Sequence, residues 1–180
     1  HVGLEASPLV DAGYTIFTVN HRATPRFKYP AAVEDMQRAV RFVRYHAGDY
    51  DIDPERIGAI GGSSAGHLVC MLGTLDGRGD PNDESPINQL SADVQCVVAR
   101  AAPTSFLEGF PPPPFLDIRL NPDTHPGAPE YRIAKEASPL SHVSADCPPF
   151  LLMHGEEDDL VPIAQSEKLA EALEEAGVAV

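Results

Sequence analysis

Hydrophobic positions along the chain form short apolar runs that alternate with longer stretches in which apolar residues recur at helical spacing. The short runs are rich in β-branched and aromatic residues, which is typical of buried strands. The predicted strands are residues 14–20, 57–61, 94–101 and 150–155, and 178–180 resembles the start of a fifth. The stretches with helical spacing follow them; the predicted helices are 65–75, 162–176, a long helix that opens at Pro30, and a helix end within 4–12.

Strands that alternate with helices predict an α/β fold with a mostly parallel sheet, with helices on both faces of it. No internal repeat interrupts the alternation, so residues 1–180 are interpreted as one domain. Within it, residues 103–149 contain most of the prolines, including a run of four at 111–114. This segment is predicted to be an irregular insertion with short helices.

Composition narrows the classes of function. The chain has 13 Lys and Arg against 27 Asp and Glu, a formal charge of −14, which argues against binding a nucleic-acid backbone. No apolar run approaches the length of a membrane-spanning helix, so no membrane span is expected. Cys70, Cys96 and Cys147 are far apart and form no CxxC motif, and buried, unreactive thiols are expected. The compartment cannot be inferred from them.

Candidate chemistry begins at the junction "RIGAIGGSSAGHLVCML", where a predicted strand turns into a predicted helix through small residues. Such a junction has the outline of a nucleophile elbow, in which a serine on a strained turn exposes its hydroxyl. A glycine-rich turn of this kind can instead bind phosphate or be purely structural. The chain has neither a GxGxxG nor a GxxxxGK[ST] motif, and no HExxH or paired Cys/His spacing indicates a metal.

A second polar cluster, "HGEEDDLVP", follows the strand predicted at 150–155. A carboxylate after a later strand fits the order serine, acid, histidine of hydrolase triads on this topology. The alternative is that Glu156, Glu157 and Asp159 are solvated loop carboxylates and that His154 only packs at the strand end.

These segments together resemble α/β-hydrolase esterases of the hormone-sensitive-lipase and acetyl- or feruloyl-esterase type. The resemblance rests on "GYTIFTVNHRATPRFKYPAAVEDMQRAVRFVR", "YDIDPERIGAIGGSSAGHL" and "FLLMHGEEDDLVPIAQSEKLAEAL", in that order. It implies the α/β-hydrolase fold and a serine carboxylic-ester hydrolase, a carboxylesterase-type enzyme that acts on small-acyl esters. It also implies a small-molecule ester substrate and no metal or organic cofactor.

Carried over residue by residue, the resemblance implies that Asp158 is the triad acid. The literal GxSxG pattern makes Ser64 the nucleophile, whereas the family spacing on both sides of the motif favours Ser63, with Ala65 where the family has glycine. The residue after the nucleophile donates one oxyanion-hole N–H. That donor is Ser64 if the nucleophile is Ser63, and Ala65 if it is Ser64.

Two parts of the family pattern are missing from the 180 residues. The HGGG-type loop that gives the second oxyanion donor is expected before His1, and the catalytic histidine is expected after Val180. The remaining histidines, among them His67 and His142, precede the acid and are interpreted as ordinary structural residues. We therefore interpret the chain as a fragment, truncated at both ends of the fold, that lacks the general base.

Other readings of the sequence stay open. An amidase or peptidase of the same fold would share the chemistry, and a non-catalytic, hydrolase-like binding protein would keep the fold without the triad. The acyl and alcohol specificity, the oligomeric state and the localisation are not readable from the residues.

Overall fold

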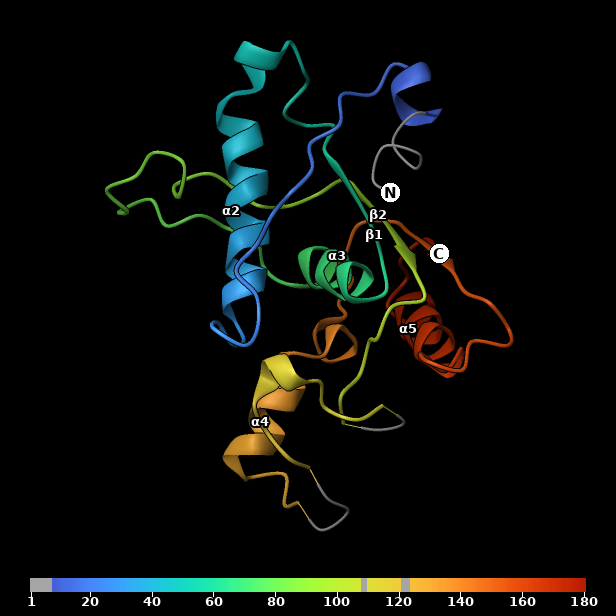
Figure 1. The fold of residues 1–180 in the computed structure, drawn as a ribbon. Helices are drawn as coiled ribbons and strands as arrows, with labels where there is room; N and C mark the ends of the chain where they lie inside the picture. The colour runs from blue at the N-terminus through green and yellow to red at the C-terminus, as the bar shows by residue number, and fades with distance from the viewer. Residues whose placement is uncertain (1–7, 108–109, 121–123) are drawn as a thin grey trace.

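The computed structural model describes residues 8–107, 110–120 and 124–180 (Figure 1). Residues 4–7 of the helix end predicted within 4–12 lie outside these ranges, whereas residues 8–11 are helical. The other helices and strands are, in chain order, α2 (Ala31–Tyr45), η1 (Ala47–Tyr50), β1 (Gly58–Gly62), α3 (Ser64–Thr74), β2 (Cys96–Arg100), η2 (Pro114–Leu116), α4 (Pro129–Glu136), η3 (Pro139–His142), β3 (Phe150–Met153) and α5 (Ala164–Glu175).

The sheet of the described residues has three parallel strands in the order β1-β2-β3. In the register, Ile60 lies opposite Val98, and Val98 lies opposite Leu151. Because the strands are parallel and in chain order, the segments that follow β1 and β3 emerge at the same edge, on either side of the end of β2. The predicted α/β class and three of the predicted strands are confirmed.

Helix α3 lies at the centre of the core. Its residues from Gly66 to Thr74 are buried, and it packs against β1 and β2 on one side and α2 on the other. Its small residues allow a very close approach to the sheet: a Cβ added at Gly73 would lie 2.6 Å from side-chain carbons of both Phe150 and Val97. The core that α3 shares with the sheet therefore has no room for an extra methyl group at this point.

Only one face of the sheet is covered in the described part of the chain. Val97 and Ala99 of β2 share the main core with Leu169 and Leu173 of α5 and with residues of α2 and α3. On the other face Ile60 is 55% exposed, and its neighbours across the register, Val98 and Leu151, point the same way. Helices on both faces were predicted, whereas α2, α3 and α5 all contribute to the core on the same face.

The strand predicted at 14–20 is wrong for this structure, because residues 14–20 form no strand and largely face solvent. A strand needs a partner to satisfy its backbone groups, and in the described sheet β1 pairs only with β2. The fifth strand predicted at 178–180 is also not formed as a strand, although the Ala179 carbonyl accepts a 3.0 Å hydrogen bond from the Phe150 N–H.

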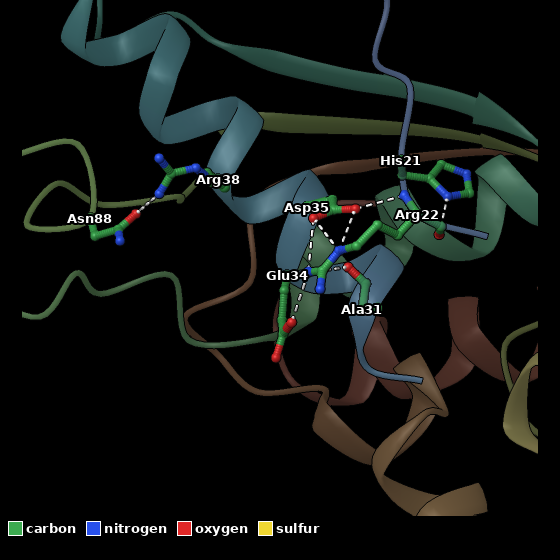
Figure 2. A network of polar contacts seen from close by, with 7 residues as sticks. All are labelled: His21, Arg22, Ala31, Glu34, Asp35, Arg38 and Asn88. Carbon is green, nitrogen blue, oxygen red and sulfur yellow. Dashed lines mark hydrogen bonds and ion pairs between the residues drawn. The ribbon is translucent and has the colours of Figure 1, made fainter. Parts of the chain in front are cut away.

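The loop before α2 is attached to that helix by Arg22 (Figure 2). Its guanidinium donates to both carboxylate oxygens of Asp35, to Glu34 and to the carbonyl of Ala31, and its backbone N–H also donates to Asp35 at 2.6 Å. The same loop ends at Tyr29, whose N–H donates to the carbonyl of Phe115. The loop thus connects α2 to the proline-rich segment.

Arginines of α2 also order the polar segment 76–93. Arg38 donates to Oδ1 of Asn88 at 2.6 Å, as Figure 2 shows, and Arg41 and Arg44 donate to backbone carbonyls of the same segment. These bonds provide donors for backbone carbonyls that have no hydrogen-bond partner within a strand or a helix. The long loop between α3 and β2 is therefore held against α2.

Residues 103–149 contain short helices, as predicted, and have a small apolar cluster of their own. Phe106, Leu116, Ala134 and Ala137 are buried there, and Phe115 and Tyr29 are among the residues packed against them.

Of the three cysteines, Cys70 is buried but Cys96 is exposed, so the prediction of buried thiols is wrong for Cys96, which lies on the uncovered face of the sheet. No helix in the described ranges has the length and apolar character needed to cross a membrane.

The close approach at Gly73 predicts that Gly73→Ala lowers the free energy of unfolding. Overpacking costs about 1–3 kcal/mol, which exceeds the gain in helix propensity of about 1 kcal/mol. Gly48→Ala is the matched control, because a Cβ at Gly48 would have no atom within 4 Å. Urea unfolding of both variants measures the effect, and equal midpoints for the two would contradict the packing interpretation.

The Arg22–Asp35 contact predicts a pH dependence of stability. Hydrogen bonds from Arg22 hold the pKa of Asp35 below its usual range, so the pair stabilises the fold above the pKa of the unfolded state and loses this effect as the pH falls. Asp35→Asn is expected to lower the urea midpoint at pH 7 by roughly 0.3 M. The difference from the wild type should close below about pH 4 and shrink in about 1 M salt. A difference independent of pH would contradict the ionic origin.

Candidate active site

Ser63 alone forms the turn between β1 and α3. The strand ends at Gly62, the helix begins at Ser64, and Ser63 has φ 54° and ψ −121°. Few residues other than glycine adopt a positive φ, and such a conformation costs on the order of 1–3 kcal/mol. The Ser63 N–H donates to the Arg100 carbonyl at 2.8 Å, which extends the β1–β2 ladder up to the turn. A strand that turns into a helix through one residue with a strained backbone is the arrangement that a nucleophile elbow requires.

Glycines on both sides of the turn make it possible. A Cβ at Gly61 would lie 2.4 Å from the Ala65 carbonyl oxygen, and one at Gly66 would lie 2.9 Å from the Cβ of Ala102. Both distances are shorter than any real Cβ contact, so neither position accepts a side chain without a backbone shift. Gly61 and Gly66 of "GGSSAG" are therefore required by the short distance between the helix and the strands.

The two candidate serines differ in backbone geometry. Ser63 has the strained conformation at the apex, and its side chain is exposed and makes no capping hydrogen bond to the helix. Ser64 is the first residue of α3 and is also exposed. Ala65, two residues after Ser63, is exposed, so a methyl group there meets no crowding. The geometry favours the register in which Ser63 is the nucleophile.

The N-terminal end of α3 begins directly after Ser63. The first N–H groups of a helix have no intrahelical acceptor, and in α3 these include Ser64 and Ala65. The N-terminal end of a helix also carries a partial positive charge. The N–H groups of Ser64 and Ala65 are therefore available as donors to an acceptor outside the helix, directly after Ser63 in the chain.

The end of β2 lies between the turn at Ser63 and the loop that follows β3 and carries Asp158, which we call the acid loop. Ala101 has φ 45°, a second positive φ at this edge of the sheet, and its N–H donates to the Met153 carbonyl at 2.8 Å. Strained residues of this kind cluster at active sites. In the register, Gly62 and Met153 lie on opposite sides of β2. They are two strand spacings apart, which is about 10 Å.

Asp158 is held in place by the backbone of its own loop. Its Oδ1 accepts hydrogen bonds from the N–H groups of Leu160 and Val161, both at 2.9 Å. These bonds, with a smaller contribution from the charge of His154, lower the pKa of Asp158 below its ordinary value. The side chain remains 23% exposed. Asp158 is thus an oriented carboxylate at neutral pH, whereas Glu156, Glu157 and Asp159 are exposed.

His154 supports the acid loop. Its Nε2 donates to the Val161 carbonyl at 2.8 Å, and its Nδ1 lies 2.7 Å from Oγ of Ser166. Oδ2 of Asp158 lies 3.6 Å from the same Nε2. Both ring nitrogens therefore have partners within the loop and α5, which fits the prediction that His154 packs at the strand end.

No histidine side chain in the described ranges is hydrogen-bonded to the side chain of Ser63. Each instead has a partner elsewhere; they are His21, His46, His67, His125, His142 and His154. The described residues also contain no group of three or more His, Cys, Asp or Glu side chains that could hold a metal ion. Hollows of about 380 Å³ and 590 Å³ are lined largely by residues of the 103–149 segment and include neither Ser63 nor Asp158.

Sequence reasoning missed two features of this site. The strained Ala101 carries no signal, because alanine gives no indication of a positive φ. The burial of His67 could have been inferred, since His67 lies one turn after Ser63 among apolar residues of the same predicted helix.

The chain is similar in sequence to known esterases. Residues 4–173 match the BD-FAE family. Esterase LipQ of Mycobacterium tuberculosis is 34% identical over 96% of this chain, and the probable carboxylic ester hydrolase LipM of the same organism is 30% identical over 93%. The chain spans only 41% and 39% of the length of these two relatives.

Solved structures agree with the sequence matches. The acetyl ester-xyloside bifunctional hydrolase from Caldicellulosiruptor lactoaceticus superimposes with a TM-score of 0.75 and 32% identity, over 89% of this chain and 56% of that chain. A truncated carbohydrate esterase from gut microbiota gives 0.79 and 29%, over 97% and 66%. With the parallel sheet and the strand–serine–helix turn described above, these matches show that the chain has the α/β-hydrolase fold and belongs to the BD-FAE family.

Proposed function

We propose that the protein is a serine carboxylic-ester hydrolase whose nucleophile is Ser63. The observation that carries the proposal is the turn itself: a single exposed serine with a positive φ between a strand and a helix N-terminus. The names of the relatives, esterase and carboxylic ester hydrolase, support the same chemistry. Ser64 is then the residue that donates an oxyanion-hole N–H.

The proposed reaction is a two-step acyl transfer. The Ser63 Oγ attacks the ester carbonyl, its proton passes to a general base and on to the leaving alcohol, and an acyl-serine forms. The Ser64 N–H and the N-terminal end of α3 stabilise the oxyanion of each tetrahedral intermediate. Water, activated by the same base, then releases the carboxylic acid and restores the serine.

We assign the acid of the triad to Asp158 and the base to a histidine outside the 180 residues. Oδ1 of Asp158 is used by the loop backbone, which leaves Oδ2 to accept from a histidine N–H. Ser63 and Asp158 follow strands whose ends are about 10 Å apart, one on each side of the end of β2. In this arrangement Asp158 holds the tautomer of the histidine and stabilises its protonated form.

Small-acyl esters are the proposed substrates. The support is the resemblance to acetyl and feruloyl esterases, together with two structural relatives named as an acetyl ester-xyloside hydrolase and a carbohydrate esterase. The chemistry of the site needs no metal or organic cofactor.

Replacing each serine in turn tests the nucleophile. In the protein expressed from its complete coding sequence, Ser63→Ala is expected to lower kcat for p-nitrophenyl acetate by about 10⁴-fold or more, because the covalent step is lost. Ser64→Ala keeps the backbone N–H and is expected to stay within about tenfold of the wild type.

Labelling gives a second readout of the same assignment. A fluorophosphonate should modify the wild type and Ser64→Ala but not Ser63→Ala, and peptide mass spectrometry should find the adduct on Ser63. An adduct on Ser64, or full turnover by Ser63→Ala, would reject the assignment.

Asp158→Asn tests the acid. The amide cannot stabilise the imidazolium or hold the correct tautomer, so kcat at pH 7 is expected to fall by about 10²–10⁴-fold while labelling slows in parallel. Asp159→Asn is the matched control, because Asp159 is the next residue in the chain and is exposed. Equal activity of the two variants would remove Asp158 from the triad.

A further inference from the structure

The C-terminal end of α4 binds side chains from three other segments. The Glu136 carbonyl accepts hydrogen bonds from the Tyr29 hydroxyl at 2.9 Å and from Nε2 of His142 at 2.8 Å, and the Ala137 carbonyl accepts from Nε2 of His67 at 2.8 Å. The last carbonyls of a helix have no intrahelical partner and need donors from elsewhere. Of the three donors, only His67 comes from the helix that follows the candidate nucleophile.

His67 is a buried, neutral donor. His67 is 2% exposed, and this burial lowers the pKa of its imidazole to about 4. The hydrogen bond to Ala137 has the opposite, smaller effect. A carbonyl oxygen only accepts, so Nε2 carries the proton. The ring also packs against Phe106 and Phe115, with ring centroids 5.1 Å and 5.5 Å away.

The same residue contacts the candidate nucleophile through its backbone. The His67 N–H donates to the Ser63 carbonyl at 3.0 Å, while its side chain donates to Ala137. One residue therefore joins the elbow to the 103–149 segment. A change of the side chain leaves the backbone bond to Ser63 in place and removes only the link to that segment.

The part of the segment nearest His67 is aromatic. Phe106 contacts Phe110 and Phe115, with ring centroids 6.1 Å and 5.8 Å apart, and we call these three residues the aromatic wall. The wall lies in the segment that follows β2 in the chain, and it contacts α3 through the His67 ring, which packs on Phe106 and Phe115. The N–H of Phe106 donates to Oγ of Ser138, next to the carbonyl that His67 holds.

We propose that His67 is a positioning residue that holds the aromatic wall at a fixed place beside Ser63 and thereby sets how strongly apolar ester groups bind. The proposal rests on the proposed function, because it gives the ester site its apolar side. His67 touches no substrate and acts through the wall. Its loss weakens binding of longer apolar groups more than it slows the chemical step.

The test compares three variants of the protein at its full encoded length. His67→Leu removes the donor, His67→Gln keeps an N–H donor at the reach of Nε2, and His142→Leu removes a bond to the neighbouring Glu136 carbonyl without touching α3. KM and kcat are measured for p-nitrophenyl acetate, butyrate and hexanoate. For His67→Leu, KM for hexanoate is expected to rise about tenfold relative to acetate, with kcat within about threefold. His67→Gln and His142→Leu should keep the wild-type ratio.

Hydrogen exchange gives a readout that needs no activity. Amides of residues 134–140 should exchange faster in His67→Leu than in the wild type, with protection recovered in His67→Gln. Equal KM ratios for His67→Leu and the wild type, or equal defects in the Gln and Leu variants, would overturn the proposal. A wild type that hydrolyses none of the esters would overturn the esterase function. If the exchange pattern were still as expected, only the structural contact between His67 and the 103–149 segment would remain supported.

Discussion

The closeness of α3 to the sheet is the constraint on which the other features of the molecule depend. Gly61, Gly66 and Gly73 are the points where the helix meets backbone or core side chains at distances that exclude a Cβ. A chain that leaves a strand and at once packs a helix against that strand must reverse direction within one residue. Ser63, with its positive φ, is that residue. The exposed hydroxyl of Ser63 and its position beside the N-terminus of α3 therefore follow from the packing of the helix against the sheet.

The cost of the strained turn is small beside the packing that imposes it. A single unfavourable backbone conformation costs on the order of 1–3 kcal/mol, whereas α3 buries a continuous apolar stretch that includes Leu68, Met71 and Leu72. Burial of each large apolar side chain contributes roughly 1.5–3 kcal/mol. The core therefore determines the conformation of Ser63 and keeps it in place without help from a ligand.

The sequence predicted correctly the strands that pair with one another in the described sheet and the helix that packs on them. Residues 57–61, 94–101 and 150–155 became strands because they pair with one another, and the helix at 65–75 has the core it needs. The equally strand-like residues 14–20 did not, since β propensity acts only where a partner is present. Exposure of Cys96 has the same cause: burial depends on a covering layer, which local pattern does not encode. At the site, the resemblance selects Asp158 as the candidate acid, but its anchoring by Leu160 and Val161 is visible only in three dimensions.

Segment 103–149 has an irregular composition, yet several of its described residues are attached to the core by buried hydrogen bonds. Its first residues are pinned by Gln165 of α5, whose Oε1 accepts from the N–H groups of Thr104 and Ser105, both at 2.8 Å and both buried. Opening it would expose these bonds and the His67–Ala137 bond, and leave buried polar groups without partners. Because Gln165 belongs to the helix after the acid loop and His67 to the helix after the elbow, the segment connects the two halves of the site. These buried hydrogen bonds thus link the helix that follows Ser63 to the helix that follows Asp158 through the described residues of the segment.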